Sequence, residues 1–307
     1  MPLHIVHHPD YDAAFPVAHR FPMGKYSMLM ERLHELALVH PGFLHVPAPA
    51  RSEWLEFAHE PAYVEQVISC KVPEKIEREI GFPINERVSR RALLAAGGTI
   101  LAARLALEHG LACNTAGGSH HAKRAHGAGF CTFNDVAVAA LVLISEKLAK
   151  KILIVDLDVH QGDGTADILA KHDRVFTFSM HAERNYPVRK IASDLDIALA
   201  DQTDDEAYLS RLDTALHTIS HQGKWDFVFY NAGVDPHRDD RLGRLAMTDE
   251  GLRKRDDLVI GHFRGRGVPV CGVLGGGYSN DLPTLAARHA ILFEIADRYA
   301  GPVSGGS

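Results

Sequence analysis

The chain has 307 residues and a formal net charge of −6, and 46% of its residues are apolar while 23% are charged. This composition is that of an ordinary globular protein, long enough for one large α/β domain or two small ones. No basic block occurs, which disfavours nucleic acid as the main partner. No apolar run approaches the ~20 residues of a membrane-spanning helix, which disfavours a membrane as partner.

The amino terminus and the cysteines indicate the compartment. The start of the chain lacks the charged and then apolar leader of a secreted protein. The four cysteines are scattered and form no C-x-x-C pair, so neither a zinc knuckle nor a disulfide framework is indicated. We therefore expect a protein of the reducing cytoplasm.

Short apolar runs alternate with helical stretches along the chain, which predicts an α/β fold: one parallel sheet with helices on both faces. We expect a single domain over residues 1–300 and a flexible tail over 301–307. Two less regular stretches, 72–87 and 181–203, are candidate rim loops. The predicted strands cover 3–7, 111–114, 152–158, 174–180, 226–231 and 269–274. The predicted helices cover 25–39, 61–70, 88–109, 135–150, 204–221, 249–264 and 282–299.

The strand predicted over 152–158 presents Asp156 and Asp158, and His160 follows at the next alternate position. Alternation would place the three side chains on one face of the strand. An ionised carboxylate in an apolar interior is costly unless it is paired, hydrogen-bonded or bound to a metal, so we expect a positive charge there. Asp163, in the turn that follows, can hydrogen-bond a neighbouring imidazole. Capping of turns is an alternative role for Asp156 and for Asp163.

Two other predicted strands also end in polar residues, at the sheet edge where ligands of parallel α/β folds bind. Asp235 follows the strand over 226–231, although Asp-Pro is also an ordinary turn signal. Together with Asp158 and His160 it makes an open Asp₂His set suited to Zn²⁺ or Fe²⁺. Three glycines after the strand over 269–274 let the backbone approach a ligand and place Tyr278 beside it.

The glycine-rich segment after the strand over 111–114 carries adjacent histidines. A loop can turn both His120 and His121 toward a site, where they could serve as ligands or as acid–base groups. His126 is a rival that we interpret as a loop residue. Phe130 would supply a flat apolar wall.

Together these segments resemble the histone deacetylase superfamily, and their details resemble class IV, the group named after histone deacetylase 11. The resemblance extends from about His4 to Ala296. Gln161, where class I enzymes have a second histidine, is one class IV feature. The similar segments are FPMGKYSML (21–29), AAGGTILAARLALEHG (95–110), SHHAKRAHGAGFCTFND (119–135), DLDVHQGDG (156–164), YNAGVDPHRDDRLGRLAMTDEGLRKRD (230–256) and GGGYS (275–279).

The resemblance implies an arginase-like fold and a zinc-dependent amide hydrolase that removes acetyl or longer acyl groups from lysine side chains. It also implies a role for each matching residue. The implied zinc ligands are Asp158, His160 and Asp235. The implied catalytic residues are His121 as general base and then acid, His120 as its electrostatic partner, Asp163 as the support of His121, and Tyr278 as the oxyanion donor. Gly129 and Phe130 match the wall of the acyl channel. The implied structural K⁺ site consists of the Asp156 side chain, Ser179, and the backbone oxygens of Asp158, His160 and Met180.

The chain differs from class I enzymes in two features. No rim aspartate can be matched in the 72–87 segment, and Lys25 stands where class I enzymes have an arginine at the channel bottom. Dimetal hydrolases of the arginase type need a further carboxylate where this chain has Gly162. Deacylation of an acetylpolyamine or another small amide, and non-catalytic binding of an acylated lysine, are the remaining alternatives. Class IV resemblance implies a preference for long-chain acyl-lysine.

Overall fold

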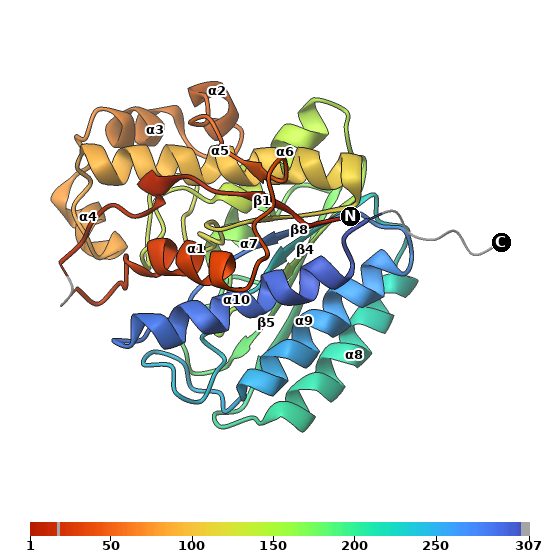
Figure 1. Ribbon diagram of the computed structural model, residues 1–307. Coiled ribbons are helices and arrows are strands. Elements are labelled where there is room, and N and C mark those ends of the chain that lie inside the picture. The colour runs from red at the N-terminus through yellow and green to blue at the C-terminus, as the bar shows by residue number, and fades with distance from the viewer. Residues whose placement is uncertain (17–18, 302–307) are drawn as a thin grey trace.

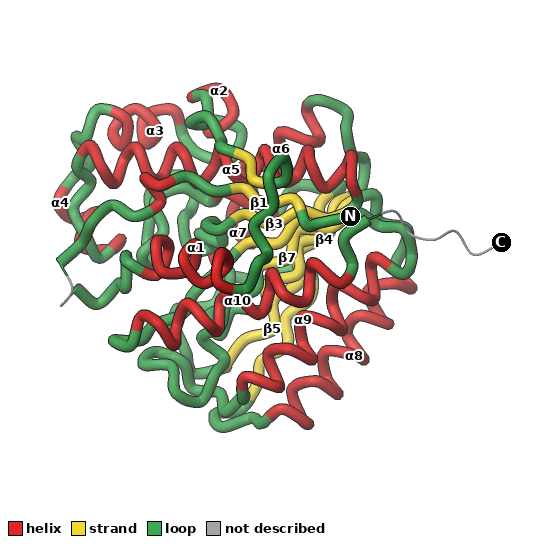
Figure 2. The backbone as a smooth tube through the Cα atoms, viewed as in Figure 1, coloured by secondary structure: helices red, strands yellow, loops and turns green. Residues whose placement is uncertain are grey.

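A central sheet of eight parallel strands organises the computed structural model, which describes residues 1–16 and 19–301 (Figure 1, Figure 2). The strand order is β2-β1-β3-β8-β7-β4-β5-β6, and every neighbouring pair is parallel. The strands are β1 (His4–Val6), β2 (Leu44–His45), β3 (Leu111–Asn114), β4 (Ile152–Asp156), β5 (Val175–Ala182), β6 (Leu195–Leu199), β7 (Phe227–Asn231) and β8 (Val270–Val273). The predicted α/β fold with one parallel sheet is therefore confirmed.

Helices cover both faces of the sheet. Figure 1 shows α8, α9 and α10 side by side on one face, while α5 and α6 lie on the other. The helices are α1 (Lys25–Glu35), α2 (Ser52–Leu55), α3 (Pro61–Ile68), α4 (Glu74–Ile80), α5 (Glu86–His109), α6 (Asp135–Ser145), α7 (Asp163–Leu169), α8 (Asp205–His221), α9 (Asp249–Arg264) and α10 (Leu282–Arg298), with a 3₁₀ turn, η1, at Pro9–Tyr11. The last residues of the predicted tail, 302–307, lie outside the described residues.

Helix α5 is the one described helix that is long and apolar enough to cross a membrane by length and composition. Here it is a core helix, since it packs against α6, β1, β3 and β8. Two adjacent glycines let other segments approach α5 closely: a Cβ on Gly97 would overlap the carbonyl oxygen of Ala48, and one on Gly98 would overlap the hydroxyl of Tyr11.

Every strand and helix expected from the sequence is present, with ends that differ by a few residues. The two stretches expected to be irregular are partly regular: 72–87 contains α4, and 181–203 contains β6. Helix α4 escapes the pattern because its sequence, EKIEREI, is mostly charged and offers too few apolar residues for a helical period. Strand β6 is a short edge strand with every second residue exposed.

The middle of the sheet positions the site. Strands β3, β8, β7 and β4 are consecutive neighbours, and their carboxyl ends are in register, as the pairs Asp156–Asn231 and Asn231–Val273 show. The loops that follow these four strands therefore converge at one edge of the sheet. These are the loops that carry the residues singled out in the sequence.

Candidate active site

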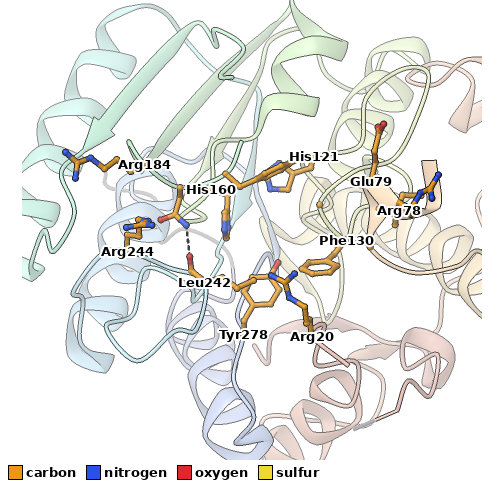
Figure 3. Close-up of a pocket in the computed structure, with 15 residues that line it drawn as sticks. Arg20, Arg78, Glu79, His121, Phe130, His160, Arg184, Leu242, Arg244 and Tyr278 are labelled. Carbon is orange, nitrogen blue, oxygen red and sulfur yellow. Dashed lines mark hydrogen bonds between the residues drawn. The ribbon is translucent and has the colours of Figure 1, made fainter. Parts of the chain in front are cut away.

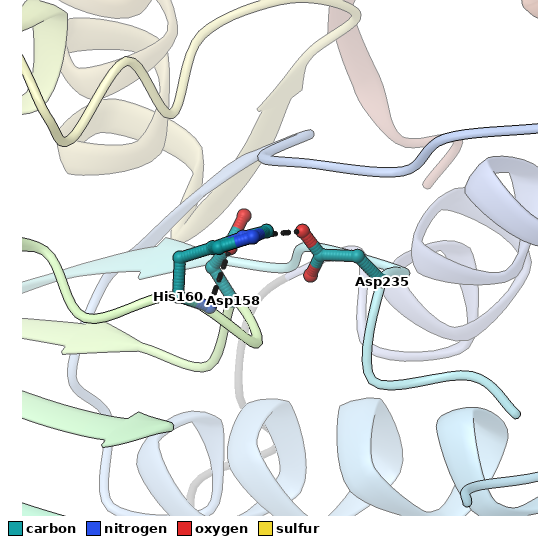
Figure 4. Close-up of side chains that lie close together, drawn as sticks. All are labelled: Asp158, His160 and Asp235. Atoms are coloured by element: carbon teal, nitrogen blue, oxygen red, sulfur yellow. Dashed lines mark hydrogen bonds and ion pairs between the residues drawn. The ribbon is translucent and has the colours of Figure 1, made fainter. Parts of the chain in front are cut away.

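Three potential metal ligands lie together beyond the ends of β4 and β7 (Figure 4). Asp158, His160 and Asp235 each offer one ligand atom, and these atoms lie within 4.8 Å of one another. The His160 Nδ1 atom is 3.0 Å from Asp158 Oδ1 and 3.1 Å from Asp235 Oδ2. All three side chains are buried.

The donor set fits a divalent cation. Burial by itself disfavours a charged imidazole, yet hydrogen bonds to Asp158 and Asp235 raise the pKa of His160 to about 10. Burial and the charge of Asp158 raise the pKa of the Asp235 carboxyl to about 7. The two buried carboxylates thus stabilise positive charge beside them, which is supplied either by the protonated imidazole or by an ion such as Zn²⁺ bound to the neutral imidazole.

The local backbone differs from the sequence expectation. Strand β4 ends at Asp156, so Asp158 and His160 lie in the following loop and not on one face of a strand. The loop is held in place by the carboxylates themselves, because the backbone N–H of His160 donates to Asp158 and that of Val159 donates to Asp235. The expected proximity of the side chains therefore arises from a bent loop.

The glycines after β8 complete the buried base of the site around the three potential ligands, which we call the floor. The N–H of Gly276 donates to Asp158 Oδ2 over 2.6 Å. A Cβ at Gly276 would overlap the Asp235 carboxylate and lie 2.7 Å from Asp158 Oδ2, so only glycine fits there. This close approach of the backbone matches the expectation for the GGG segment.

Beneath the floor lies a fully buried arginine that the sequence did not single out. The Arg255 guanidinium of α9 donates to the carbonyl oxygens of Leu157, Ala232 and Gly233, which belong to the two loops that carry the carboxylates. Asp256 neutralises it at 2.8 Å. Arg255 therefore ties the two ligand-bearing loops together.

The two adjacent histidines differ in protonation: His120 is charged and His121 is neutral. His120 Nδ1 lies 2.7 Å from Asp156, and His121 Nδ1 lies 2.7 Å from Asp163. Burial disfavours the charged form of both rings, but the charges of Asp156 and Asp158 raise the pKa of His120 to about 9. Burial and the charge of His120 lower the pKa of His121 to about 3. His121 is therefore neutral at pH 7, with Nδ1 held by Asp163 and Nε2 left for the pocket.

Two carboxylates outside the ligand group hold the loop that carries His120 and His121 and the loop that carries Tyr278. Buried Asp135 accepts hydrogen bonds from the N–H groups of Gly118 and Ser119, directly before the histidines. Asp240 accepts one from the N–H of Tyr278 over 2.7 Å. Neither aspartate was singled out in the sequence, since an isolated Asp carries no signal of the loop that it will hold.

A pocket of about 410 Å³ opens onto this floor (Figure 3). His121, His160 and Tyr278 reach its base, and Gly129 and Phe130 line its wall. Tyr186 is a wall residue that the sequence did not indicate: its ring meets His121 edge-on, with 4.8 Å between the centroids. His126 lies apart, near Glu79, as expected for a loop residue. The remaining lining residues are Arg20, Arg78, Glu79, Ile80, Gly81, Arg184, Asn185, Leu242 and Arg244.

Behind Tyr278 lies a second cavity of only about 20 Å³. Phe21, Tyr26 and Arg91 line it together with glycines of the two loops. Lys25 is buried close by, where its Nζ donates to the carbonyl of Gly275 over 3.2 Å. The sequence placed Lys25 at the bottom of the channel, and Arg91 of α5 is a second cation there that it did not indicate.

The predicted potassium ligands lie next to each other on β4 and β5, with Asp156 paired to Ser179 in the register. Both carboxylate oxygens of Asp156 already accept hydrogen bonds: Oδ2 is bound to His120, and Oδ1 to the side chain of Asn231 and the N–H of Asp158. Met180 is buried beside them. The K⁺ site stays a prediction.

Comparison with known proteins gives consistent matches. The histone deacetylase domain family matches residues 19–292. An uncharacterized protein of Picosynechococcus sp. is 49% identical over 292 residues, which cover 95% of this chain and 97% of the relative. Histone deacetylase 2 of Arabidopsis thaliana is 30% identical over 286 residues, which cover 89% of this chain and 74% of the relative. The crystal structure of an HDAC homologue from Aquifex aeolicus matches with a TM-score of 0.83 at 24% identity, over 96% of this chain and 84% of that one.

Proposed function

Because the chain belongs to the histone deacetylase family, we propose that it is a zinc-dependent amidohydrolase that removes an acyl group from a lysine side chain. Relatives of this family support a deacetylase or deacylase activity in general terms. One observation carries the finer proposal: the buried group of Asp158, His160 and Asp235 lies at the base of the same pocket that His121 and Tyr278 line.

The residues of the chain divide the chemistry between them. A zinc ion held by the Asp₂His group would polarise the substrate carbonyl and make a bound water more acidic. His121 accepts the proton of the attacking water at Nε2, because its Nδ1 is held by Asp163, and later returns it to the leaving amine. Burial raises the pKa of the Tyr278 hydroxyl, which keeps it protonated as a donor to the developing oxyanion.

The acyl group that the site favours is short. The cavity behind Tyr278 measures about 20 Å³, room for about one water molecule and not for a row of methylenes. Its wall includes Arg91, whose guanidinium is buried and donates to the Tyr11 carbonyl and the Tyr26 hydroxyl, so an alkyl chain could enlarge the cavity only by displacing a hydrogen-bonded charge. We therefore propose acetyl or a similarly small acyl group, in place of the long chain that class IV resemblance implies.

The class IV assignment remains part of the proposal. Gln161, its sequence feature, is buried and directed away from the ligand group. Its side chain donates to Ile191 O and Asp196 and accepts from Ile191 N, which fastens the β5–β6 segment to the loop after β4. A second histidine could not reproduce all three of these hydrogen bonds, so Gln161 supports a distinct loop arrangement.

The test is hydrolysis of an acetyl-lysine peptide by the purified protein, measured as acetate released after loading with Zn²⁺ or Fe²⁺. We expect turnover that disappears with a chelator and returns with the metal. His121→Ala should abolish it, whereas the matched loop variant His126→Ala should retain it. Equal turnover by His121→Ala and wild type would contradict the proposed role of His121. Octanoyl- and myristoyl-lysine peptides test the acyl group, and we expect acetyl to be the best of the three.

A further inference from the structure

The mouth of the pocket carries a charge opposite to that of the whole protein. Four arginines line it, and we call Arg20, Arg78, Arg184 and Arg244 the arginine rim. They come from four separate segments, and all are exposed. Figure 3 shows Arg184 and Arg244 on one side of the pocket and Arg78 on the opposite side. Glu79 is the one acidic residue among the lining residues, on a chain whose net charge is −6.

The fold does not neutralise the arginine rim. Arg184 and Arg244 share a single carboxylate, Asp201, at 3.8 and 3.3 Å. Among the residues that the structure describes, Arg78 pairs only with Glu74 of its own helix, at 3.3 Å. Within residues 1–16 and 19–301, no acidic side chain pairs with Arg20. The rim therefore retains an excess of positive charge in a place where no packing requirement calls for it.

We propose that the arginine rim selects acyl-lysine flanked on both sides by acidic residues, an inference that rests on the proposed function. The floor takes the acylated side chain, and the segments on either side of that lysine must then cross the mouth between Arg78 and the Arg184–Arg244 pair. Arginine binds carboxylates in a bidentate geometry, so aspartate or glutamate in these segments is the chemistry that fits.

The same charges act against the polyamine alternative. An acetylated polyamine carries further ammonium groups within a few ångströms of the scissile amide, and these would approach the arginine rim on entry. Like charges that face each other in an encounter slow association and weaken binding. A lysine-rich peptide meets the same repulsion.

Three peptides test this inference, each with a central acetyl-lysine flanked by two aspartates, two glycines or two lysines on each side. N-acetylspermidine is the fourth substrate. One exposed ion pair changes an equilibrium by about 1.4- to 5-fold, so two or three pairs predict a kcat/KM roughly tenfold higher for the acidic than for the basic peptide in dilute buffer. The ratio should shrink toward one in 1 M NaCl, where the screening length falls to about 3 Å.

Binding of fluorescent versions of the peptides, followed by anisotropy with the metal-loaded protein, gives a readout that does not depend on turnover. If no peptide is hydrolysed, the proposed function fails, while the anisotropy ranking still decides the charge preference. Tighter binding or faster hydrolysis of the basic peptide or of N-acetylspermidine would overturn the inference.

Charge-reversal variants assign the preference to the rim. Arg244→Glu and, on the opposite side, Arg78→Glu should each reduce the acidic-to-basic ratio at least threefold. Arg211→Glu makes the same change of charge on the exposed face of α8 and should leave the ratio unchanged. Thermal melting verifies that each variant is folded. Equal ratios in Arg244→Glu, Arg78→Glu and Arg211→Glu would contradict the assignment.

Discussion

The floor of the pocket and its arginine rim are built on different principles. On the floor, carboxylates and imidazoles are buried, and each is held by hydrogen bonds that come from other loops, as the bond from Gly276 N to Asp158 shows. At the rim, Arg184 and Arg244 extend into solvent and share one partner. The floor has one arrangement that satisfies its charges, whereas the rim can be altered side chain by side chain.

Because of this difference, the floor determines metal binding and catalysis, and the rim determines which substrates are preferred. Buried charges are costly unless every partner is present, so substitution on the floor affects metal binding, catalysis and folding together. Exposed charges act through the field that they create at the mouth, which changes which substrates enter and leaves the core intact. Substitutions on the floor should therefore have larger effects than substitutions at the rim.

The largest effect is expected for Asp235→Asn. The substitution keeps the shape of the side chain but removes one of the two carboxylates that face His160. Changes to groups around metal ligands already cost about 10–100-fold in metal affinity, so loss of a ligand should cost at least about 100-fold and leave no metal-dependent turnover. Elemental analysis after dialysis measures the bound metal. Asp173→Asn, in an exposed turn, is the control, and full retention of zinc by Asp235→Asn would exclude it as a ligand.

Substitution of Arg255, the buried arginine beneath the floor, should have an effect almost as large. Arg255→Met removes the cation that joins the two ligand-bearing loops and leaves Asp256 buried without its charge partner. Breaking a buried pair in this way typically costs about 3–5 kcal/mol of unfolding free energy. Urea unfolding measures the loss. Adding Asp256→Asn should restore part of it, and a single variant within about 1 kcal/mol of wild type would show that the loops hold their positions without Arg255.

Tyr278→Phe separates catalysis from folding on the same floor. The hydroxyl makes no hydrogen bond to another described residue, so its loss should not disturb packing. Removing one oxyanion donor typically lowers kcat about 10²–10³-fold, and the bound metal should be unchanged. Tyr299→Phe, which removes a hydroxyl from the far end of α10, is the matched control. A Tyr278→Phe rate within about threefold of wild type would show that another group stabilises the oxyanion.

A buried histidine outside the pocket makes the free energy of unfolding depend on pH. His59 lies between Lys123 O at 2.8 Å and Asn134 N at 2.9 Å, so its neutral ring joins two points of the loop between β3 and α6, both of which follow His120 and His121 in the chain. Burial lowers the pKa of His59 to about 4. Above pH 6.5 its contribution to stability is complete. Between pH 6.5 and 4 the unfolded chain takes up a proton that the folded one does not, which costs up to about 3 kcal/mol.

The measurement is the free energy of unfolding across that pH range. His59→Gln, which can still donate and accept hydrogen bonds, should have a shallower decline toward acid than wild type. His217→Gln, on an exposed face of α8, should decline as wild type does. Identical slopes for His59→Gln and wild type would mean that other groups carry the acid sensitivity.

The sequence predicted the sheet, most helices and the residues of the floor, because those features leave local signals. Carboxylates in an apolar run, as at Asp156, and glycines after a buried strand break the local pattern and are visible without a structure. The supports were not predictable in this way. Arg255, Asp135 and His59 lie in ordinary helical or loop sequence, and their importance arises from loops that lie far away along the chain.

The arginine rim was also invisible in the sequence, for a different physical reason. Its members are separated by up to 224 positions, from Arg20 to Arg244, and each looks like any exposed arginine. Only the fold brings them to one mouth. The two expected rim loops indicated the region correctly, since α4 supplies Arg78 and the segment after β5 supplies Arg184, but not its charge.

The smallest effect is expected at the rim itself, in stability. Arg184→Ala combined with Arg244→Ala removes two contacts to Asp201, but exposed ion pairs of this kind contribute only about 0–1 kcal/mol each. The double variant should therefore unfold within about 2 kcal/mol of wild type and keep its metal, while its acidic-to-basic substrate ratio falls. Urea unfolding and elemental analysis measure the first two quantities. A loss of several kcal/mol would mean that Asp201 and its arginines fasten the loop after β7, in which case floor and rim would form one structural unit and selection could not be altered apart from folding.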